Sequence, residues 1–159
     1  MAAENTASGK AMEYALISVL KDMAGTEAAP AGSTSVPSFE TSLIHAHITF
    51  DGECSGELGM FMDPALAAQI ASRILGADPN EPLLQEMILD AGKELLNVIC
   101  GQFLTMRFGP EPIFSLGVPR VFPLSAQACN ALISSSPISL FKIGAHFLPA
   151  YVRVRQKTP

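Results

Sequence analysis

Residues 82–106 read PLLQEMILDAGKELLNVICGQFLTM, the longest uninterrupted helical pattern in the chain. At about 100° per residue, a helix over this segment has one broad apolar side, made of Ile88, Ala91, Leu95, Leu96, Val98, Ile99 and Phe103. The opposite side is a polar arc of roughly 80°, made of Glu86, Asp90, Glu94, Asn97 and Gly101. We therefore expect an amphipathic helix that ends at about Arg107, ahead of Gly109 and Pro110.

The polar arc contains residues that could carry chemistry. Glu94 and Asn97 are one helical turn apart and so lie side by side on the surface. Gly101 follows one turn later, where a missing side chain would let another molecule's backbone come close. A glycine inside a helix costs about 0.5–1 kcal/mol relative to alanine, so a compensating role is expected. The alternative is an ordinary solvated face with a spare glycine, since charged outer faces are common.

Length and composition favour one compact domain. The chain has 159 residues, of which 48% are apolar and 16% charged, enough to bury a core. We expect a flexible tail over residues 1–9 and a single domain over 10–159. The net charge of −5 argues against nucleic-acid binding, which needs a clustered basic patch.

The compartment is predicted from three further features. No apolar run approaches the roughly 20 residues that cross a bilayer, so no membrane span is expected. The N-terminal MAAENTASGK lacks the apolar core of a signal peptide. The cysteines are odd in number and lack C-x-x-C spacing, which indicates reduced thiols at Cys54, Cys100 and Cys129. We expect a cytoplasmic protein.

The elements predicted in order form an α+β fold, with a mostly antiparallel sheet and long helices packed on it. A helix over 10–24 is followed by a loop over 25–38 and a hairpin of strands 39–50 and 53–62, turning at Asp51-Gly52. A second helix runs from the N-cap Asp63 to Gly76. After the long helix we expect a strand at 112–119, an irregular segment at 120–136 with a possible helical turn, and strands at 139–148 and 150–156 that meet at Pro149.

The element order hints at a degenerate internal helix–strand–strand–helix duplication. Glu13-Tyr-Ala-Leu16 of the first helix aligns with Glu94-Leu-Leu-Asn97 of the third. The first helix then has a glutamate but no asparagine.

The spacing Asp90-x3-Glu94-x2-Asn97, followed by Gly101 and Pro119, resembles the signature of the CheC/CheX/FliY chemotaxis phosphatases. The surrounding text DAGKELLNVICGQF is similar to their ElxNxixG helix, and the predicted element order agrees from about residue 10 to 156. With one intact motif, the chain looks more like CheX than the two-site CheC. One residue fewer separates Asn97 from Pro119 than in the family pattern, which a deletion near Gly109 would explain.

The resemblance implies hydrolysis of the aspartyl phosphate on a CheY-type response-regulator receiver domain. Asn97 would orient the attacking water, and Glu94 would pair with the receiver's lysine. Glu86, Asp90, Gly101 and Pro119 would contact the partner. The Mg²⁺ ion would be held by the receiver's own carboxylates, with no metal bound by this chain. CheX-like relatives form dimers by joining sheets, so a homodimer is also expected.

Two other functions remain open. The same fold could serve as a non-catalytic protein-interaction module, with the helix face merely binding a partner. Alternatively, His45 and His47 project to one strand face and could bind a metal, provided that His146 or an acidic residue supplies a third ligand. Alternation in a half-exposed strand explains the two histidines equally well.

Overall fold

The computed structural model describes residues 2–32 and 35–159. In this part of the chain, the predicted α+β class is confirmed, with four helices and seven strands. The helices are α1 (Ala2–Ala24), α2 (Pro64–Leu75), α3 (Gln85–Phe108) and α4 (Ala126–Ser134). The strands are β1 (Ala29–Pro30), β2 (Leu43–Asp51), β3 (Cys54–Met62), β4 (Ser115–Leu116), β5 (Arg120–Leu124), β6 (Ile138–Ile143) and β7 (His146–Gln156).

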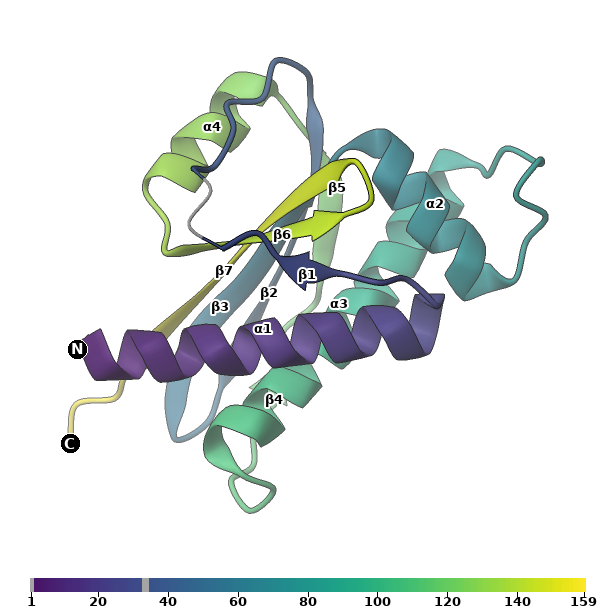
Figure 1. Ribbon diagram of the computed structural model, residues 1–159. Coiled ribbons are helices and arrows are strands. Elements are labelled where there is room, and N and C mark those ends of the chain that lie inside the picture. Colours follow the sequence, from purple (N-terminus) through teal and green to yellow (C-terminus); the bar gives the residue numbers. More distant parts are fainter. Residues whose placement is uncertain (1, 33–34) are drawn as a thin grey trace.

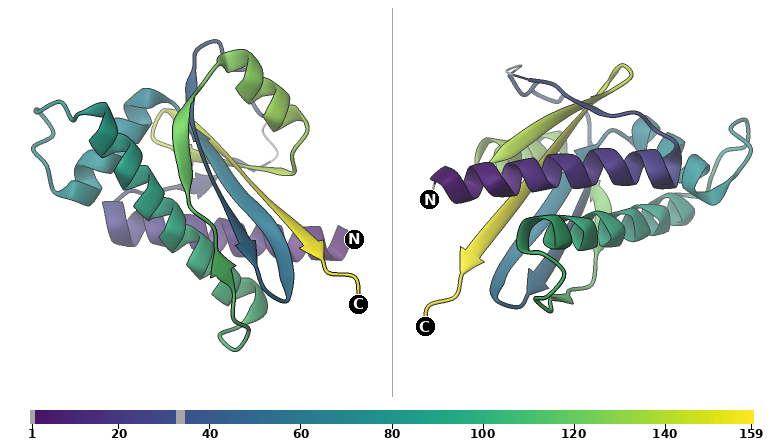
Figure 2. Two further views of the ribbon diagram at one scale, coloured as in Figure 1. Left: turned by 180° about the vertical axis from the view of Figure 1, so that it is seen from behind. Right: turned by 60° about the horizontal axis from the view of Figure 1, so that its bottom comes forward.

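The strands form one antiparallel sheet in the order β1-β6-β7-β3-β2-β4. Strand β5 pairs with the first half of β2, and β4 pairs with its end. Helices α1, α2 and α3 lie on one face of the sheet, and the short α4 covers one end of the other face (Figures 1 and 2). The main core lies between the sheet and the three helices. A smaller cluster under α4 includes Phe61, Cys129 and Tyr151.

The β2–β3 hairpin confirms the predicted alternation. The predicted inner face of β2 is buried in the main core, where it meets Leu58, Met60 and Met62 of β3. The predicted turn is slightly wrong, because Asp51 still belongs to β2 and pairs with Ser55. The chain therefore turns after Asp51, and the register keeps Ile44, Ala46, Ile48 and Phe50 on the main core face, while Leu43 and Phe61 pack on the other face under α4.

Helix α2 begins and ends as predicted. The Asp63 carboxylate accepts a hydrogen bond from the Leu66 amide at 2.8 Å, Pro64 occupies the first turn, and Gly76 ends the helix at φ 62°. Asp63 also contacts His146 of the β6–β7 hairpin, with Oδ2 and Nδ1 2.6 Å apart. One carboxylate thus joins the start of α2 to the hairpin beside it.

Helix α1 begins earlier than predicted. The structure places residues 2–9 in its first turns, so the predicted start at residue 10 is wrong. Buried Ser8 shows why, since it packs near the end of α3 and its hydroxyl accepts a hydrogen bond from Arg107 Nε at 3.3 Å. The Glu4 carboxylate accepts another from Gln156 Nε2 at the end of β7. These tertiary contacts support a polar sequence with no helical pattern of its own.

The predicted loop at 25–38 contains a two-residue strand, β1, which pairs with Phe141 and Lys142 of β6. Residues 33 and 34 of this loop lie outside the described residues.

The segment 120–136 was predicted to be irregular with a possible helical turn. The helical turn is confirmed as α4, but the prediction missed the strand β5 before it. Pro123 argued against a strand in the sequence. Strand β5 lies at the edge of the sheet, however, where a residue without an amide hydrogen is tolerated. Ser125 caps α4 by accepting a hydrogen bond from the Ala128 amide at 3.2 Å.

The last hairpin turns at Gly144-Ala145 rather than at Pro149. Gly144 has a φ of 58°, which suits the first position of a two-residue hairpin turn. Pro149 lies inside β7, opposite Leu140 of β6. Pairing of β7 with β3 begins only at Ala150, so the missing amide hydrogen removes no bond between those two strands.

Candidate functional site

The middle of α3 is held firmly from one side. Leu95, Leu96 and Ile99 are fully buried against the sheet and the neighbouring helices. Each such side chain stabilises the fold by about 1.5–3 kcal/mol relative to exposure. Glu94 and Asn97 lie on the exposed side of the same turns. The buried residues therefore fix which way these two polar side chains face.

The side chains of Glu94 and Asn97 do not stabilise the fold through polar contacts in the described ranges. In the described ranges, neither side chain forms a hydrogen bond or ion pair with the rest of the chain. The nearby Asp90 contacts Lys93 at 3.5 Å, but both are exposed, so this pair contributes little to stability. Glu86 is exposed on the same face. The face is thus acidic and available to a partner that carries positive charge.

Gly101 lies one turn below Asn97 and faces open space. A Cβ atom built on it would have no atom within 4 Å, apart from the helix's own neighbouring backbone. Gly101 also lines a groove of about 200 Å³ with Thr105 of α3 and with Phe114 and Leu116 of the following segment. Packing within this chain therefore does not require a glycine at position 101.

Pro119 lies in a β-bulge. Both β4 and β5 pair with β2, but their registers differ by one residue, with Leu116 opposite Phe50 and Arg120 opposite His47. The segment 117–119 therefore has one residue more than the stretch of β2 that it faces. Val121 packs near Gly92, and Leu116 shares the groove with Gly101. The bulge is thus bracketed by contacts with α3 on either side of Asn97.

The structure corrects one assignment on α3. Val98 was predicted on the apolar side of the helix, yet it is 42% exposed. It lies at the border of that side, next to Asn97 in sequence, and Met87 is exposed on the same face. Sequence periodicity missed Val98 because a border position is buried only if a neighbouring element covers it. Glu94 and Asn97 therefore have exposed apolar neighbours.

Helix α1 packs beside α3, and burial shows which residues of the two correspond (Figures 1 and 2). The predicted alignment of Leu16 with Asn97 is wrong, because Leu16 is 0% exposed. The pattern of exposed and buried residues instead matches Tyr14–Ser18 with Glu94–Val98. Tyr14 and Ile17 then stand where α3 has Glu94 and Asn97. The corresponding face of α1 therefore lacks both polar residues.

The histidines belong to a buried hydrogen-bond network. His45 is 5% exposed, and its Nε2 lies 3.0 Å from the Tyr151 hydroxyl. That hydroxyl donates its only hydrogen to Glu57 at 2.9 Å, so Nε2 of His45 donates to Tyr151. His45 Nδ1 is buried with no partner in the described ranges. Burial, with a smaller effect from His47, lowers the pKa of His45 to about 4.

This arrangement does not form the three-ligand metal site that is the alternative interpretation of His45 and His47. His146, the suggested third ligand, contacts Asp63 instead. Within residues 2–32 and 35–159, no group of three or more His, Cys, Asp or Glu side chains could hold a metal ion. His47 contacts Glu57 at 3.4 Å and stacks on His45, which accounts for both imidazoles through the sheet network.

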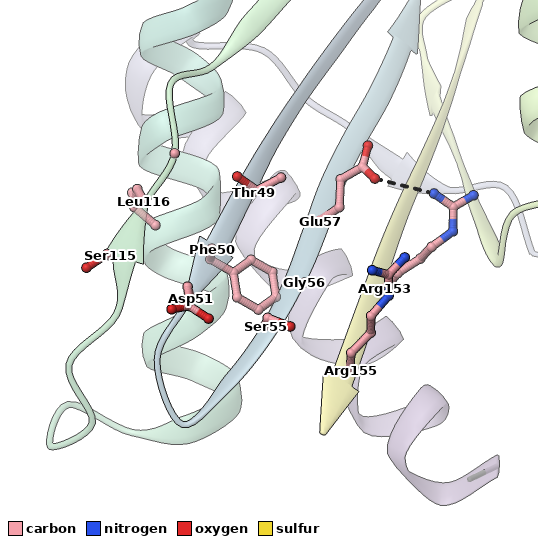
Figure 3. A pocket seen from close by; sticks show the side chains of 11 residues that line it. Thr49, Phe50, Asp51, Ser55, Gly56, Glu57, Ser115, Leu116, Arg153 and Arg155 are labelled. Carbon is pink, nitrogen blue, oxygen red and sulfur yellow. Dashed lines mark ion pairs between the residues drawn. The ribbon is translucent and has the colours of Figure 1, made fainter. Parts of the chain in front are cut away.

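A second groove of about 400 Å³ lies on the sheet face away from α1, α2 and α3 (Figure 3). Thr49, Glu57 and Arg153 line it from three adjacent strands. Arg153 and Glu57 form an ion pair at 3.6 Å, drawn as a dashed line in Figure 3. Arg153 is thus paired within the sheet, whereas Arg155, which also lines the groove, has no ion pair in the described ranges.

Cys100 is in the core, as the helical pattern predicted. It is fully buried, and burial raises its pKa to about 12. A thiol in that environment stays protonated at neutral pH and is not a nucleophile.

The two glycines of α3 give a matched test. Gly101→Ala should raise the free energy of unfolding by about 0.5–1 kcal/mol, because alanine favours the helix and the space is open. Gly92→Ala should gain less, because its Cβ would lie 3.2 Å from Val121 Cγ1. Urea unfolding measures both changes. Destabilisation by Gly101→Ala would show that the fold does need this glycine.

His45 should make stability depend on pH. Its pKa is about 4 in the folded protein and 6.5 in the unfolded chain, so the unfolded chain binds more protons between these values. The free energy of unfolding should therefore fall as pH drops from 6.5 towards 4, by on the order of 2–3 kcal/mol from this residue. Denaturation of the wild type and of His45→Gln at pH 7 and 4.5 measures the difference. Equal losses in both proteins would contradict this assignment.

No helix in the described ranges is both long enough and apolar enough to span a membrane.

Solved structures that share this fold include three chemotaxis-related proteins. A chemotaxis protein CheX from Desulfovibrio desulfuricans is 20% identical, with 93% of this chain and 99% of that chain covered and a TM-score of 0.70. CheX from Borrelia burgdorferi, solved as a CheX–CheY–BeF3–Mg complex, is 20% identical, with 92% and 97% covered and a TM-score of 0.67. A CheC-like superfamily protein from a Shewanella species is 18% identical, with 94% and 99% covered and a TM-score of 0.65.

No curated protein matches the chain. The sequence itself matches the family of the chemotaxis phosphatase CheX over residues 44–139, which is more than half of its length. This match includes β2 except its first residue, all of β3, and all of α3 with its exposed polar face. The chain therefore belongs to the CheX family of chemotaxis phosphatases.

Proposed function

We propose that this protein hydrolyses the aspartyl phosphate of a CheY-type receiver domain, with Asn97 and Glu94 of α3 as the reacting face. The observation that carries the proposal is that both side chains are exposed and without partners in the described ranges, on a helix fixed by its buried side. Family membership and the CheX–CheY complex of the Borrelia protein support the choice of substrate.

Asn97 would position the water. Its carboxamide oxygen can accept a hydrogen bond from water, and its amide group can donate to a phosphoryl oxygen. An acyl phosphate is already reactive, so alignment of the water with the P–O bond supplies most of the needed acceleration. Water oxygen attacks phosphorus, the bond to the receiver's aspartate breaks, and the products are inorganic phosphate and a free carboxylate.

Glu94 would set the docking register. Its carboxylate is exposed one turn before Asn97, within reach of a lysine ammonium from the receiver. Asp90 and Glu86 extend the acidic face and would favour approach of the same basic surface. Gly101 and Pro119 would border the contact. A Mg²⁺ ion, bound by the receiver's own carboxylates, would neutralise charge on the phosphoryl group.

Substitutions at the two polar residues test this proposal. Asn97→Ala should lower the rate of receiver dephosphorylation by roughly 100-fold, because the water loses its alignment. Glu94→Ala should raise KM about tenfold by removing the charged contact. Phosphate release from a phosphorylated CheY-type receiver with Mg²⁺ measures both effects. The control is Glu13→Ala, which also removes a carboxylate but from α1, whose exposed face lacks the two polar residues. It should keep wild-type rates.

Folding does not confound this test. Alanine is a better helix former than asparagine, so Asn97→Ala should be at least as stable as the wild type. Binding of several receivers by the wild-type protein without any acceleration would contradict the proposal and favour a non-catalytic interaction module.

We also propose a homodimer formed through sheet edges. At one edge, β1 covers β6 at only two residues, and at the other edge β4 is two residues long. The outer side of β5 and most of the outer side of β6 therefore have no strand beside them in the described ranges, and such uncovered edges leave backbone groups available to a second strand. Light scattering at micromolar concentration should give twice the monomer mass of 16.8 kDa. A monomer mass would contradict the proposal.

A further inference from the structure

The segment between α3 and β5 presents two strongly exposed apolar side chains. Ile113 is 88% exposed and Val118 is 83% exposed. A single exposed apolar residue is ordinary, but two on one short segment beside a candidate site indicate a contact surface. The left view of Figure 2 shows that the chain turns after α3 and leads through this segment into β5, which runs back beside α3.

Ile113 is held out by a rigid support. Its neighbour Phe114 packs into an aromatic cluster, with its ring centroid 5.3 Å from that of Phe108 and 6.0 Å from that of Phe50. Pro110 and Pro112 restrict the backbone before it. The loop therefore loses little conformational freedom when a partner binds, which favours affinity.

Val118 is turned outward by the bulge at 117–119. A bulge breaks strand alternation and re-aims the side chain at that point. The Gly117 amide donates a hydrogen bond to the Thr49 carbonyl oxygen at 2.8 Å, which fixes the bulge to β2. Val118 is thus exposed on a supported backbone, as Ile113 is.

The segment that carries Ile113 and Val118 meets α3 at Gly101, the last residue of the polar face. Leu116, between the two exposed residues, lines the groove that Gly101 also lines. Residues 113–119 carry no charged side chain, whereas the α3 face beside them is acidic. A partner that binds Glu94 and extends past Gly101 would meet this uncharged segment, which carries Ile113 and Val118.

We propose that Ile113 and Val118 bind apolar side chains of the receiver domain next to its phosphorylated aspartate, and so determine affinity for the receiver. This inference rests on the proposed function. Because neither residue reaches the reacting atoms, both should act on KM and leave kcat unchanged, unlike Asn97. Apolar contacts at the edge of an acidic face would also distinguish one receiver from another.

The test compares Ile113→Ser, Val118→Ser and the double variant with wild type in receiver dephosphorylation. The double variant should raise KM about tenfold with kcat unchanged, because both positions would lose the apolar surface that they bury against the receiver. Both side chains are exposed, so folding should be intact by circular dichroism. Ile113→Leu with Val118→Ile should retain the wild-type KM, and Leu75→Ser, exposed at the end of α2, is the matched control.

The outcomes separate this inference from the proposed function. An active wild type and a double variant with unchanged KM would overturn the inference alone. A double variant that changes oligomeric state but not KM would assign the segment to a second copy of this chain, which also overturns it. If the wild type is inactive, the test is the Kd of the wild type and of the double variant for a receiver loaded with beryllium trifluoride and Mg²⁺. A higher Kd in the double variant supports the inference, whereas an equal Kd or no binding overturns it.

Discussion

Burial of one side of α3 is the constraint on which the site depends. Leu95, Leu96, Ile99 and Phe103 fill the space between the sheet and the neighbouring helices. Gly92 adds to this constraint, since its missing side chain lets the helix approach Val121 of β5. A helix that rotated by one residue would expose leucine and bury Asn97 or Glu94, at a cost of several kcal/mol. The core therefore determines which residues meet a partner.

The two faces of the sheet have different roles. One face is covered by α1, α2 and α3, and the candidate site lies on the side of α3 that points away from the sheet. The other face holds a polar network in which Glu57 accepts from Tyr151 and contacts both His47 and Arg153. That network matches its charges internally, whereas the α3 face leaves Glu94 and Asn97 without partners in the described ranges. Unmatched polar groups on a rigid base favour intermolecular recognition.

The comparison of α1 with α3 shows how one helix face can lose its chemistry while keeping its packing. Both helices bury the same positions against the sheet, so their exposed positions correspond as well. Tyr14 and Ile17 occupy the places of Glu94 and Asn97. The core tolerates this difference because neither position packs into it. Selection on packing and selection on the exposed face can therefore act separately.

Local sequence determined much of the fold. Alternation predicted the inner face of β2, and the pair Asp63-Pro64 with Gly76 predicted both ends of α2, because caps and strand faces depend on near neighbours. The spacing of Glu94, Asn97 and Gly101 predicted a shared helix face for the same reason.

Only the tertiary structure decided features that depend on distant contacts. Residues 2–9 are helical beside α3 and β7, β5 forms at a sheet edge despite Pro123, and the last turn falls at Gly144. Val98 is exposed because no neighbouring element covers it fully. The exposed positions of Ile113 and Val118 follow from an aromatic anchor and a bulge against β2. Sequence periodicity encodes the faces of one element, whereas coverage of those faces depends on which elements pack together.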